Sequence, residues 1–218
     1  MLSCFDGSHA FLFLADISEK ETMLGKFYSG THYLTNWTAS KDDNASLTDP
    51  YNLSQASEKG HPIKFELKSS TGELVSLDDD KYAGKPKLIS LMGTWCPNCL
   101  DESKFLLEYM DNNREVDIPI IAIAFERYRE EKRAIEGLAR YKERLNLPYD
   151  ILYGGYYDKK EATKNIRIID EIKSYPTLLF VDSENIITKV HTGFAGPATS
   201  KYDEFVNDFD REIRLLMK

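Results

Sequence analysis

Two cysteines stand three residues apart in the stretch Gly93-Thr-Trp-Cys-Pro-Asn-Cys, directly after an apolar run that predicts a buried strand. Apolar residues recur at helical spacing from Cys99 onward, so a helix is expected to begin at this point. Cys96 would then lie in the first helical turn, where unpaired backbone N–H groups favour a thiolate over a thiol. A lowered pKa makes a cysteine both a competent nucleophile and a good leaving group.

The second cysteine, Cys99, would lie on the same helix face and within disulfide reach of Cys96. This arrangement predicts that Cys96 attacks a substrate disulfide and that Cys99 resolves the mixed disulfide. Pro97 suits the first turn because its missing N–H would be unpaired there anyway. Trp95 is expected to flank the sulfurs as a flat apolar wall, and Asn98 completes the segment that meets a substrate.

A pair of cysteines at this spacing has other possible uses. Structural zinc needs four ligands, and the sequence offers no second cysteine pair and no histidine cluster. A purely structural disulfide would close too small a loop to stabilise the fold much. A redox-active disulfide is therefore the favoured interpretation, with no metal and no bound cofactor expected.

A second feature supports this interpretation, the dipeptide Tyr175-Pro176 just before the apolar strand that begins at Thr177. Proline at a strand start cannot donate to the ladder and tolerates a cis bond. On its own such a dipeptide is more often a simple turn. Downstream of the Cys96 motif, it predicts a loop opposite the cysteines, where the Tyr175 backbone could pair with a substrate strand.

The elements expected from residue 61 onward alternate between strands and helices. Strands are predicted near 63–67, 74–77, 87–92, 118–125, 150–153, 177–181 and 186–190, with helices after Cys99, after Arg133, over 159–172 and near the C-terminus. This order predicts an α/β thioredoxin-like fold, with a central mixed sheet and helices on both faces.

The residues before this pattern predict a separate β segment. Short aromatic runs over 9–17, 22–28 and 31–38 are typical of strands, and three strands alone make a marginal unit. We therefore assign residues 1–40 to a β segment that ends a larger β-rich domain, 41–60 to a linker and 61–218 to the thioredoxin-like domain.

Composition limits the classes of protein. A net charge of −8 argues against nucleic-acid binding, and no apolar run approaches the ~20 residues that a membrane span needs. The N-terminus shows no signal peptide, so the chain is either cytosolic or cut from a longer precursor. The third cysteine, Cys4, is expected to be inert.

The quoted motifs resemble the TlpA/ResA-like thiol–disulfide oxidoreductases of the thioredoxin superfamily, which are related to AhpC/TSA and redoxin proteins. The similarity runs from Phe65 to the C-terminus, and residues before the linker resemble the β-rich domain of some Bacteroidetes-type members. The resemblance implies a cis Pro176, a disulfide that cycles through Cys96, and protein thiols or disulfides with an upstream electron donor as partners. It also implies a periplasmic or other extracytoplasmic location, with the cytoplasm as the alternative.

Two positions depart from the family pattern. Ser90 stands where thioredoxin has a buried aspartate, so the proton acceptor for Cys99 must lie elsewhere or be water. Glu126, just past the central strand, is the candidate acid, although a solvated glutamate would look the same. Asn185 replaces a turn glycine, which asparagine can do because it tolerates positive φ.

Three functions remain open. The leading one is a thiol–disulfide oxidoreductase. A peroxiredoxin-like peroxide reductase with an antioxidant role is the second, although Thr94 is too close to Cys96 for the usual Pro-x-x-x-Thr-x-x-Cys context. The third is a non-enzymatic interaction module, which intact Cys96, Cys99 and Pro176 disfavour. The direction of electron flow depends on a potential that the sequence does not reveal.

Overall fold

The computed structural model describes residues 1–5, 10–18, 22–31 and 33–218, and it divides into two compact units, Met1–Leu47 and Thr48–Lys218. His9 and His32, which the sequence places in or beside strands, lie outside the described residues. No helix among the residues described is long and apolar enough to cross a membrane.

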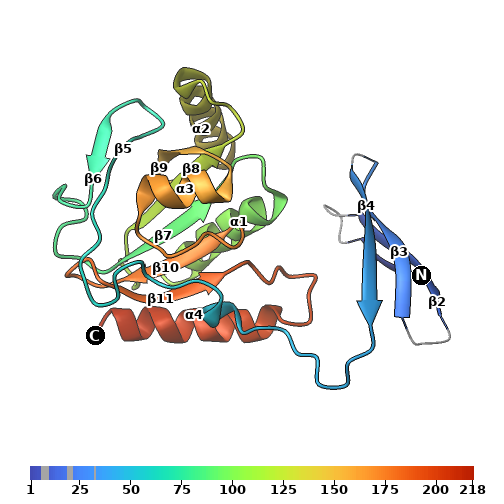
Figure 1. Cartoon of the computed structure of the whole chain (residues 1–218). Helices are drawn as coiled ribbons and strands as arrows, with labels where there is room; N and C mark the ends of the chain where they lie inside the picture. The colour runs from blue at the N-terminus through green and yellow to red at the C-terminus, as the bar shows by residue number, and fades with distance from the viewer. Residues whose placement is uncertain (6–9, 19–21, 32) are drawn as a thin grey trace. The chain divides into compact units, whose positions relative to one another are not determined.

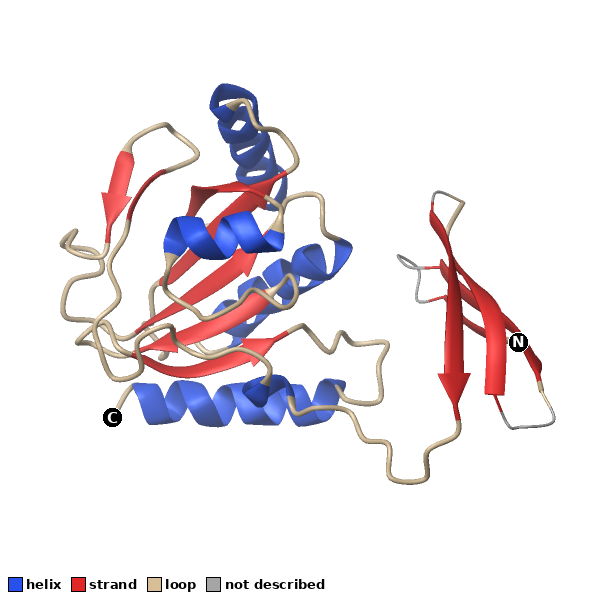
Figure 2. Cartoon of the chain, viewed as in Figure 1, coloured by secondary structure: helices blue, strands red, loops and turns tan. Residues whose placement is uncertain are grey.

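The first unit is a four-stranded antiparallel sheet in the order β1-β2-β3-β4 (Figure 2). The predicted strands are present, and the sequence did not reveal β1, which contains Cys4. The sheet is held by aromatic pairs on one face, for example Phe13 against Phe27 at 4.6 Å between ring centroids. Its strands are β1 (Leu2–Phe5), β2 (Ala10–Ile17), β3 (Thr22–Ser29) and β4 (Tyr33–Ser40).

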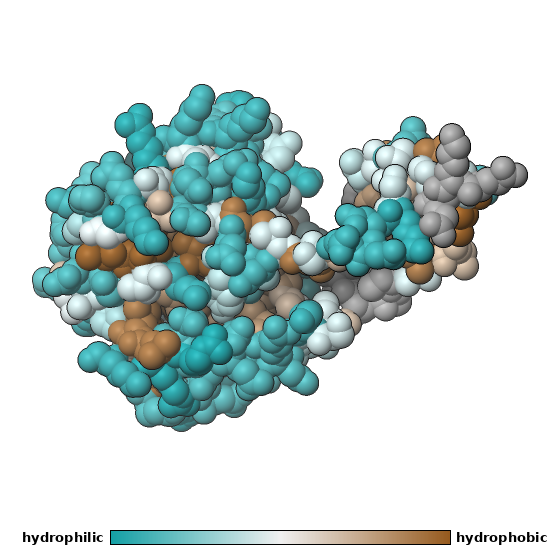
Figure 3. Space-filling model, turned by 60° about the horizontal axis from the view of Figure 1, so that its bottom comes forward, coloured by the Kyte–Doolittle hydropathy of each residue, from teal (hydrophilic) through white to brown (hydrophobic). Residues whose placement is uncertain are grey.

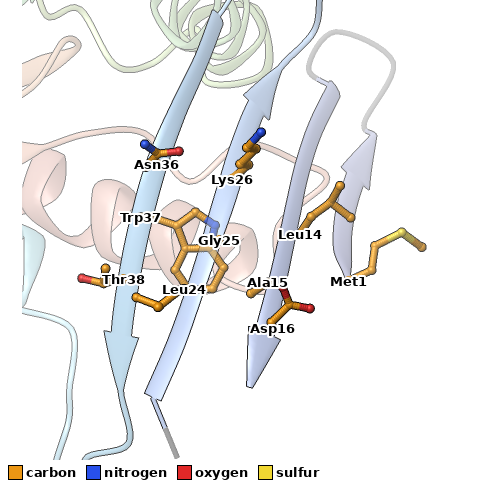
Figure 4. A pocket seen from close by; sticks show the side chains of 10 residues that line it. All are labelled: Met1, Leu14, Ala15, Asp16, Leu24, Gly25, Lys26, Asn36, Trp37 and Thr38. Carbon is orange, nitrogen blue, oxygen red and sulfur yellow. The ribbon is translucent and has the colours of Figure 1, made fainter. Parts of the chain in front are cut away.

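A glycine lets this sheet hold its tryptophan. Trp37 on β4 is opposite Gly25 on β3, and a Cβ on Gly25 would come within 2.8 Å of the indole and 2.1 Å of the Leu14 carbonyl oxygen. Trp37 can therefore lie across the β3 backbone, where it lines a pocket of about 660 Å³ together with Leu14 and Lys26 (Figure 4).

The second unit is built on a five-stranded mixed sheet in the order β11-β10-β7-β8-β9. Strands β7, β8 and β9 are parallel, whereas β10 is antiparallel to both β7 and β11. The strands are β7 (Lys87–Met92), β8 (Ile120–Glu126), β9 (Asp150–Tyr156), β10 (Thr177–Val181) and β11 (Ile187–Thr192), and a small hairpin comprises β5 (Glu66–Lys68) and β6 (Leu74–Ser76).

Every residue of β7, β8 and β10 is buried, as expected for central strands covered on both faces. Two helix contacts define one layer: Phe105 of α1 packs on Phe209 of α4, and the Tyr141 hydroxyl of α2 donates to Ser103 of α1. Figure 1 shows α3 crossing in front of the sheet while α1 lies behind it. The helices are α1 (Pro97–Asn112), α2 (Glu131–Leu145), α3 (Lys159–Ile166) and α4 (Tyr202–Leu216).

The thioredoxin-like α/β fold is thus as predicted, with helices on both faces of a mixed sheet and an additional N-terminal β sheet. The predicted helix over 159–172 is shorter in the structure, because Arg167 takes a left-handed conformation with φ of 50° and ends α3. Asn185 also has positive φ, 65°, as its turn position predicted.

The stretch predicted as a linker, 41–60, is divided between the two units. Residues from Thr48 belong to the second unit, where η1 (Pro50–Asn52) lies against β11. The buried Ser54 hydroxyl donates to the Glu171 carbonyl, and Ser57 N–H donates to the Ile168 carbonyl. These polar residues form a strap along the domain, because their hydroxyl and backbone groups find partners there.

Hydrophilic side chains dominate the face of the second unit that Figure 3 shows, and apolar side chains appear there only in small patches. Its core therefore takes up most of the apolar side chains. In the first unit, Ile17, Leu24 and Leu34 are exposed, as expected when one layer of four strands has no second layer to cover it.

Candidate active site

The two cysteines are positioned by the junction of β7 and α1. Cys96 is the N-cap of α1 and Pro97 is its first residue, as predicted. The Cys96 sulfur accepts a hydrogen bond from Cys99 N–H at 3.3 Å, which satisfies one of the free donors of the helix terminus. Both cysteines are free thiols in this structure, and both are buried.

The environment separates the two thiols in acidity. The Cys99 thiol, together with the backbone N–H groups of Cys99 and Asn98, holds the pKa of Cys96 below that of an ordinary thiol, although burial opposes this. Burial raises the pKa of Cys99, and a charge on Cys96 raises it further. Cys96 is thus suited to attack as a thiolate, and Cys99 is suited to wait as a protonated thiol.

The loop before β10 lies opposite the cysteines. The Cys96 sulfur is 3.7 Å from the Tyr175 carbonyl oxygen, and the Tyr175–Pro176 peptide bond is cis, as the resemblance implied. The Thr177 hydroxyl donates to the Ser174 carbonyl and closes this loop. The structure therefore brings together Cys96, Cys99, Tyr175 and Pro176.

Trp95 is held beside the cysteines by two contacts. Its indole N–H donates to the Phe125 carbonyl at 2.9 Å, and its ring meets Tyr175 edge to face at 5.9 Å. Gly93 allows this placement, because a Cβ there would lie 2.5 Å from the indole nitrogen. Pro97 and Asn98 are exposed at the helix start, so the predicted substrate-facing residues line one surface around Cys96.

Glu126, the predicted acid, ends β8 and is buried. Its carboxylate accepts from the Thr94 backbone N–H and from the Thr94 hydroxyl, both at 2.8 Å. Burial raises the pKa of Glu126, and these two hydrogen bonds act in the opposite direction. Both oxygens thus bind the segment before Cys96, and no hydrogen bond among the described residues joins Glu126 to Cys99.

A different acid, Glu102, lies behind the cysteines. It follows Cys99 by one helical turn, is 1 % exposed, and accepts from the Ser90 hydroxyl at 2.6 Å. Burial raises the pKa of Glu102 to about 8, a shift that the charge on Cys96 increases and the Ser90 hydroxyl opposes. Its own charge in turn raises the pKa of Cys99, so the acid and the thiol are coupled.

Sequence reasoning missed Glu102, although Ser90 was noticed as a substitution. The usable signal was the spacing: a carboxylate three residues after Cys99 lies on the helix face that is turned to the sheet. The other carboxylate oxygen of Glu102 has no hydrogen-bond partner in the described structure. An unpaired buried carboxylate oxygen is costly to keep, which is typical of a functional site rather than of a structural one.

No group of three or more metal-ligating side chains occurs among the residues described. Of the histidines singled out from the sequence, His191 is buried against Tyr51 and Phe205, and its Nδ1 is 3.0 Å from the Gly193 carbonyl. It packs in the core of the domain, on the far strand β11.

Comparison with known proteins decides the family. The AhpC/TSA family signature matches residues 60–190, more than half of the chain. The chain belongs to the AhpC/TSA family. Two relatives agree: "Thioredoxin-like protein YneN" of Bacillus subtilis is 28 % identical over 133 residues, 59 % of this chain and 68 % of the relative. "Thiol-disulfide oxidoreductase ResA" of Halalkalibacterium halodurans is 26 % identical over 156 residues, 71 % of this chain and 77 % of the relative.

Solved structures share the fold. One is the "C-terminal domain of putative thiol-disulfide oxidoreductase from Bacteroides thetaiotaomicron", with a TM-score of 0.53 and 16 % identity, covering 73 % of this chain and 98 % of that one. Another is a thioredoxin family protein from Chlorobium tepidum, with a TM-score of 0.53 and 18 % identity, covering 74 % and 98 %. The predicted family and fold are thereby confirmed, and this AhpC/TSA chain is a thiol–disulfide oxidoreductase.

Proposed function

We propose that the chain reduces or exchanges disulfides in protein substrates through a Cys96–Cys99 dithiol that cycles with a disulfide. The observation that carries this proposal is the division of acidity between the two thiols at the start of α1. Cys96 has a lowered pKa at the helix N-terminus, and Cys99 has a raised pKa behind it. No cofactor is needed, because the disulfide itself carries two electrons.

The first step is attack by the Cys96 thiolate on the substrate disulfide. A bond forms between Cys96 and one substrate sulfur, and the other substrate sulfur leaves as a thiolate that takes up a proton from water. Tyr175 and Pro176 face the Cys96 sulfur across 3.7 Å, so a substrate strand can pair with the Tyr175 backbone while its sulfur meets Cys96.

The second step is resolution by Cys99. Its thiol gives a proton to Glu102, and the new thiolate attacks the Cys96 sulfur and expels the second substrate thiolate. The products are a substrate dithiol and a Cys96–Cys99 disulfide, which an external dithiol must reduce again. Glu102 is suited to this transfer because its pKa of about 8 lies near working pH.

Glu126 takes a different part in this proposal. It holds the Thr94 segment through two hydrogen bonds and so fixes the start of the motif. It is a positioning residue, whereas Glu102 exchanges a proton with Cys99.

The protein is proposed to act outside the cytoplasm, as the resemblance to TlpA/ResA-like proteins implies, with the cytoplasm as the alternative. Fractionation of the source cells against markers of each compartment tests the location. The upstream donor is proposed to be a protein dithiol, since only a dithiol can return the Cys96–Cys99 disulfide to the reduced state by the same chemistry.

The function is tested by comparing two oxidants. With dithiothreitol as the final reductant, we expect the purified chain to accelerate the reduction of insulin disulfides, and we expect its oxidation by hydrogen peroxide to be slow. Fast peroxide reduction that survives Cys99→Ser would support the peroxidase alternative instead. Failure to accelerate insulin reduction, with the chain folded and its thiols reduced, would argue for the non-enzymatic alternative.

A further inference from the structure

An exposed arginine lies directly beside the proposed disulfide-exchange site. Arg127 follows the last residue of β8, and its guanidinium stacks on the Trp95 ring at 4.6 Å from the centroid. It also lies 5.9 Å from the centroid of the Tyr157 ring. We call Arg127, Trp95 and Tyr157 the arginine platform.

The two rings of the platform are fixed in place. Trp95 donates its indole N–H to the Phe125 carbonyl, and it meets Tyr157 edge to face at 5.4 Å. Tyr157 in turn accepts, through its carbonyl, from the Tyr175 hydroxyl in the loop opposite Cys96. The arginine therefore stacks on a surface that is tied to both sides of the exchange site.

The charge of Arg127 is not neutralised within the domain. No carboxylate of the described residues lies within ion-pair distance of its guanidinium, although its neighbour Glu126 attracts it at longer range. Both oxygens of Glu126 already accept from Thr94. Nearby, Asp158 caps α3 by accepting from Glu161 N–H. Arg127 thus offers its donors to solvent, in a chain whose net charge is −8.

A second arginine in the same loop shows the contrast. Arg129 stacks on Tyr156 at 3.8 Å and also makes two hydrogen bonds of 3.1 Å to the Glu161 carboxylate. The same geometry, a stacked guanidinium whose edge binds a carboxylate, is thus completed inside the protein at Arg129. At Arg127 the stack is present and the carboxylate is missing. Stacking leaves the edge of a guanidinium free for bidentate pairing.

We propose that Arg127 is a specificity residue that selects substrates with an acidic side chain close to the reacting disulfide. This inference rests on the proposed function. A substrate whose sulfur meets Cys96 passes Trp95, which precedes Cys96, and so brings its neighbouring residues to the platform. A carboxylate there would complete at Arg127 the arrangement that Glu161 completes at Arg129.

The test uses two peptides with the same intramolecular disulfide, which differ only in Glu or Gln beside the reacting cysteine. We expect the wild-type chain to reduce the Glu peptide with a kcat/KM about fivefold higher, the scale of a partly exposed bidentate ion pair. Arg127→Gln should remove this preference and leave reduction of the Gln peptide within about twofold. Raising the salt concentration should weaken the preference in the wild type.

The matched control is Arg133→Gln, because Arg133 stacks on Tyr128 in the same way, at 3.9 Å, and lies in α2 outside the platform. This variant should keep the preference. An equal loss on both peptides in Arg127→Gln would contradict the inference and assign Arg127 to holding Trp95 in place. Equal reduction of both peptides by the wild type overturns the inference alone, whereas reduction of neither overturns the proposed function as well.

Discussion

Cys96→Ser is expected to lower disulfide-reductase turnover by at least about a thousandfold, the order of loss that follows removal of a catalytic nucleophile. Serine keeps the size of the side chain and its place at the N-cap of α1, so the fold should persist. Cys99 cannot take over, because it is 1 % exposed and burial raises its pKa. The measurement is the rate of insulin reduction with dithiothreitol, corrected for the rate without protein.

The third cysteine supplies the matched control. Cys4 lies in β1 of the first unit, and Cys4→Ser makes the same chemical change there. This variant is expected to keep full turnover. Turnover in Cys96→Ser that stays within a few-fold of the Cys4→Ser rate would rule out Cys96 as the nucleophile.

Glu102→Gln is expected to slow resolution of the mixed disulfide by about a hundredfold, the lower end of what a positioned general base contributes. Glutamine can keep the hydrogen bond from Ser90 but cannot take a proton from Cys99. In the wild type the resolution rate should rise with pH as Glu102 ionises, with a midpoint near its pKa of about 8. Glu102→Gln should lose this rise, which single-turnover kinetics at several pH values can measure.

The same substitution should make the protein more stable. The pKa of Glu102 is about 8 in the folded chain against about 4.3 in an unfolded one, so the folded state binds its proton more tightly. The ionised acid is favoured in the unfolded chain, and the wild type therefore loses stability as pH rises from about 4.3 to about 8. Glu102→Gln escapes this loss, which is of the order of 3 kcal/mol at pH 7.

Glu108→Gln is the control for both effects, since Glu108 is an exposed glutamate on the same helix. Its kinetics and its urea unfolding curve should match those of the wild type. A Glu102→Gln variant with wild-type resolution and wild-type pH dependence would exclude Glu102 as the proton acceptor. A slower but more stable variant is the signature of an acid retained for function at the expense of stability.

The central site could be predicted because its chemistry depends on residue type and short spacing. Cys96, Cys99 and Pro97 follow from helix-terminus physics, and the placement of Pro176 follows from the resemblance. Glu102 could not be picked out in the same way. The helix start reads Asp101-Glu102-Ser103-Lys104, and only packing against Ser90 shows which carboxylate is buried.

The parts of the fold that the sequence missed are those that depend on tertiary contacts. β1 is four residues long and is defined by its pairing with β2, which no local pattern records. The segment from Thr48 to Gly60 is polar and was expected to be a linker, yet Ser54 is 1 % exposed and bound to Glu171. Local composition cannot show that such a segment has found partners more than a hundred residues away.

The arginine platform illustrates the same limit. Arg127 and Arg129 stand two residues apart in a run of charged residues that the sequence indicates as an exposed helix start. Only the structure shows that one is paired with Glu161 and that the other stacks on Trp95 without a carboxylate.

The most direct test of the account is to trap the reaction halfway. Cys99→Ser cannot resolve the mixed disulfide, so incubation of the reduced variant with a disulfide-containing protein should accumulate a covalent adduct through Cys96. Acid quenching and mass spectrometry of the unreduced peptides would locate the bond. The account predicts a Cys96-to-substrate disulfide that dithiothreitol releases and that is absent from Cys96→Ser. An adduct on another residue, or turnover by Cys99→Ser with Cys96 never linked to substrate, would contradict it.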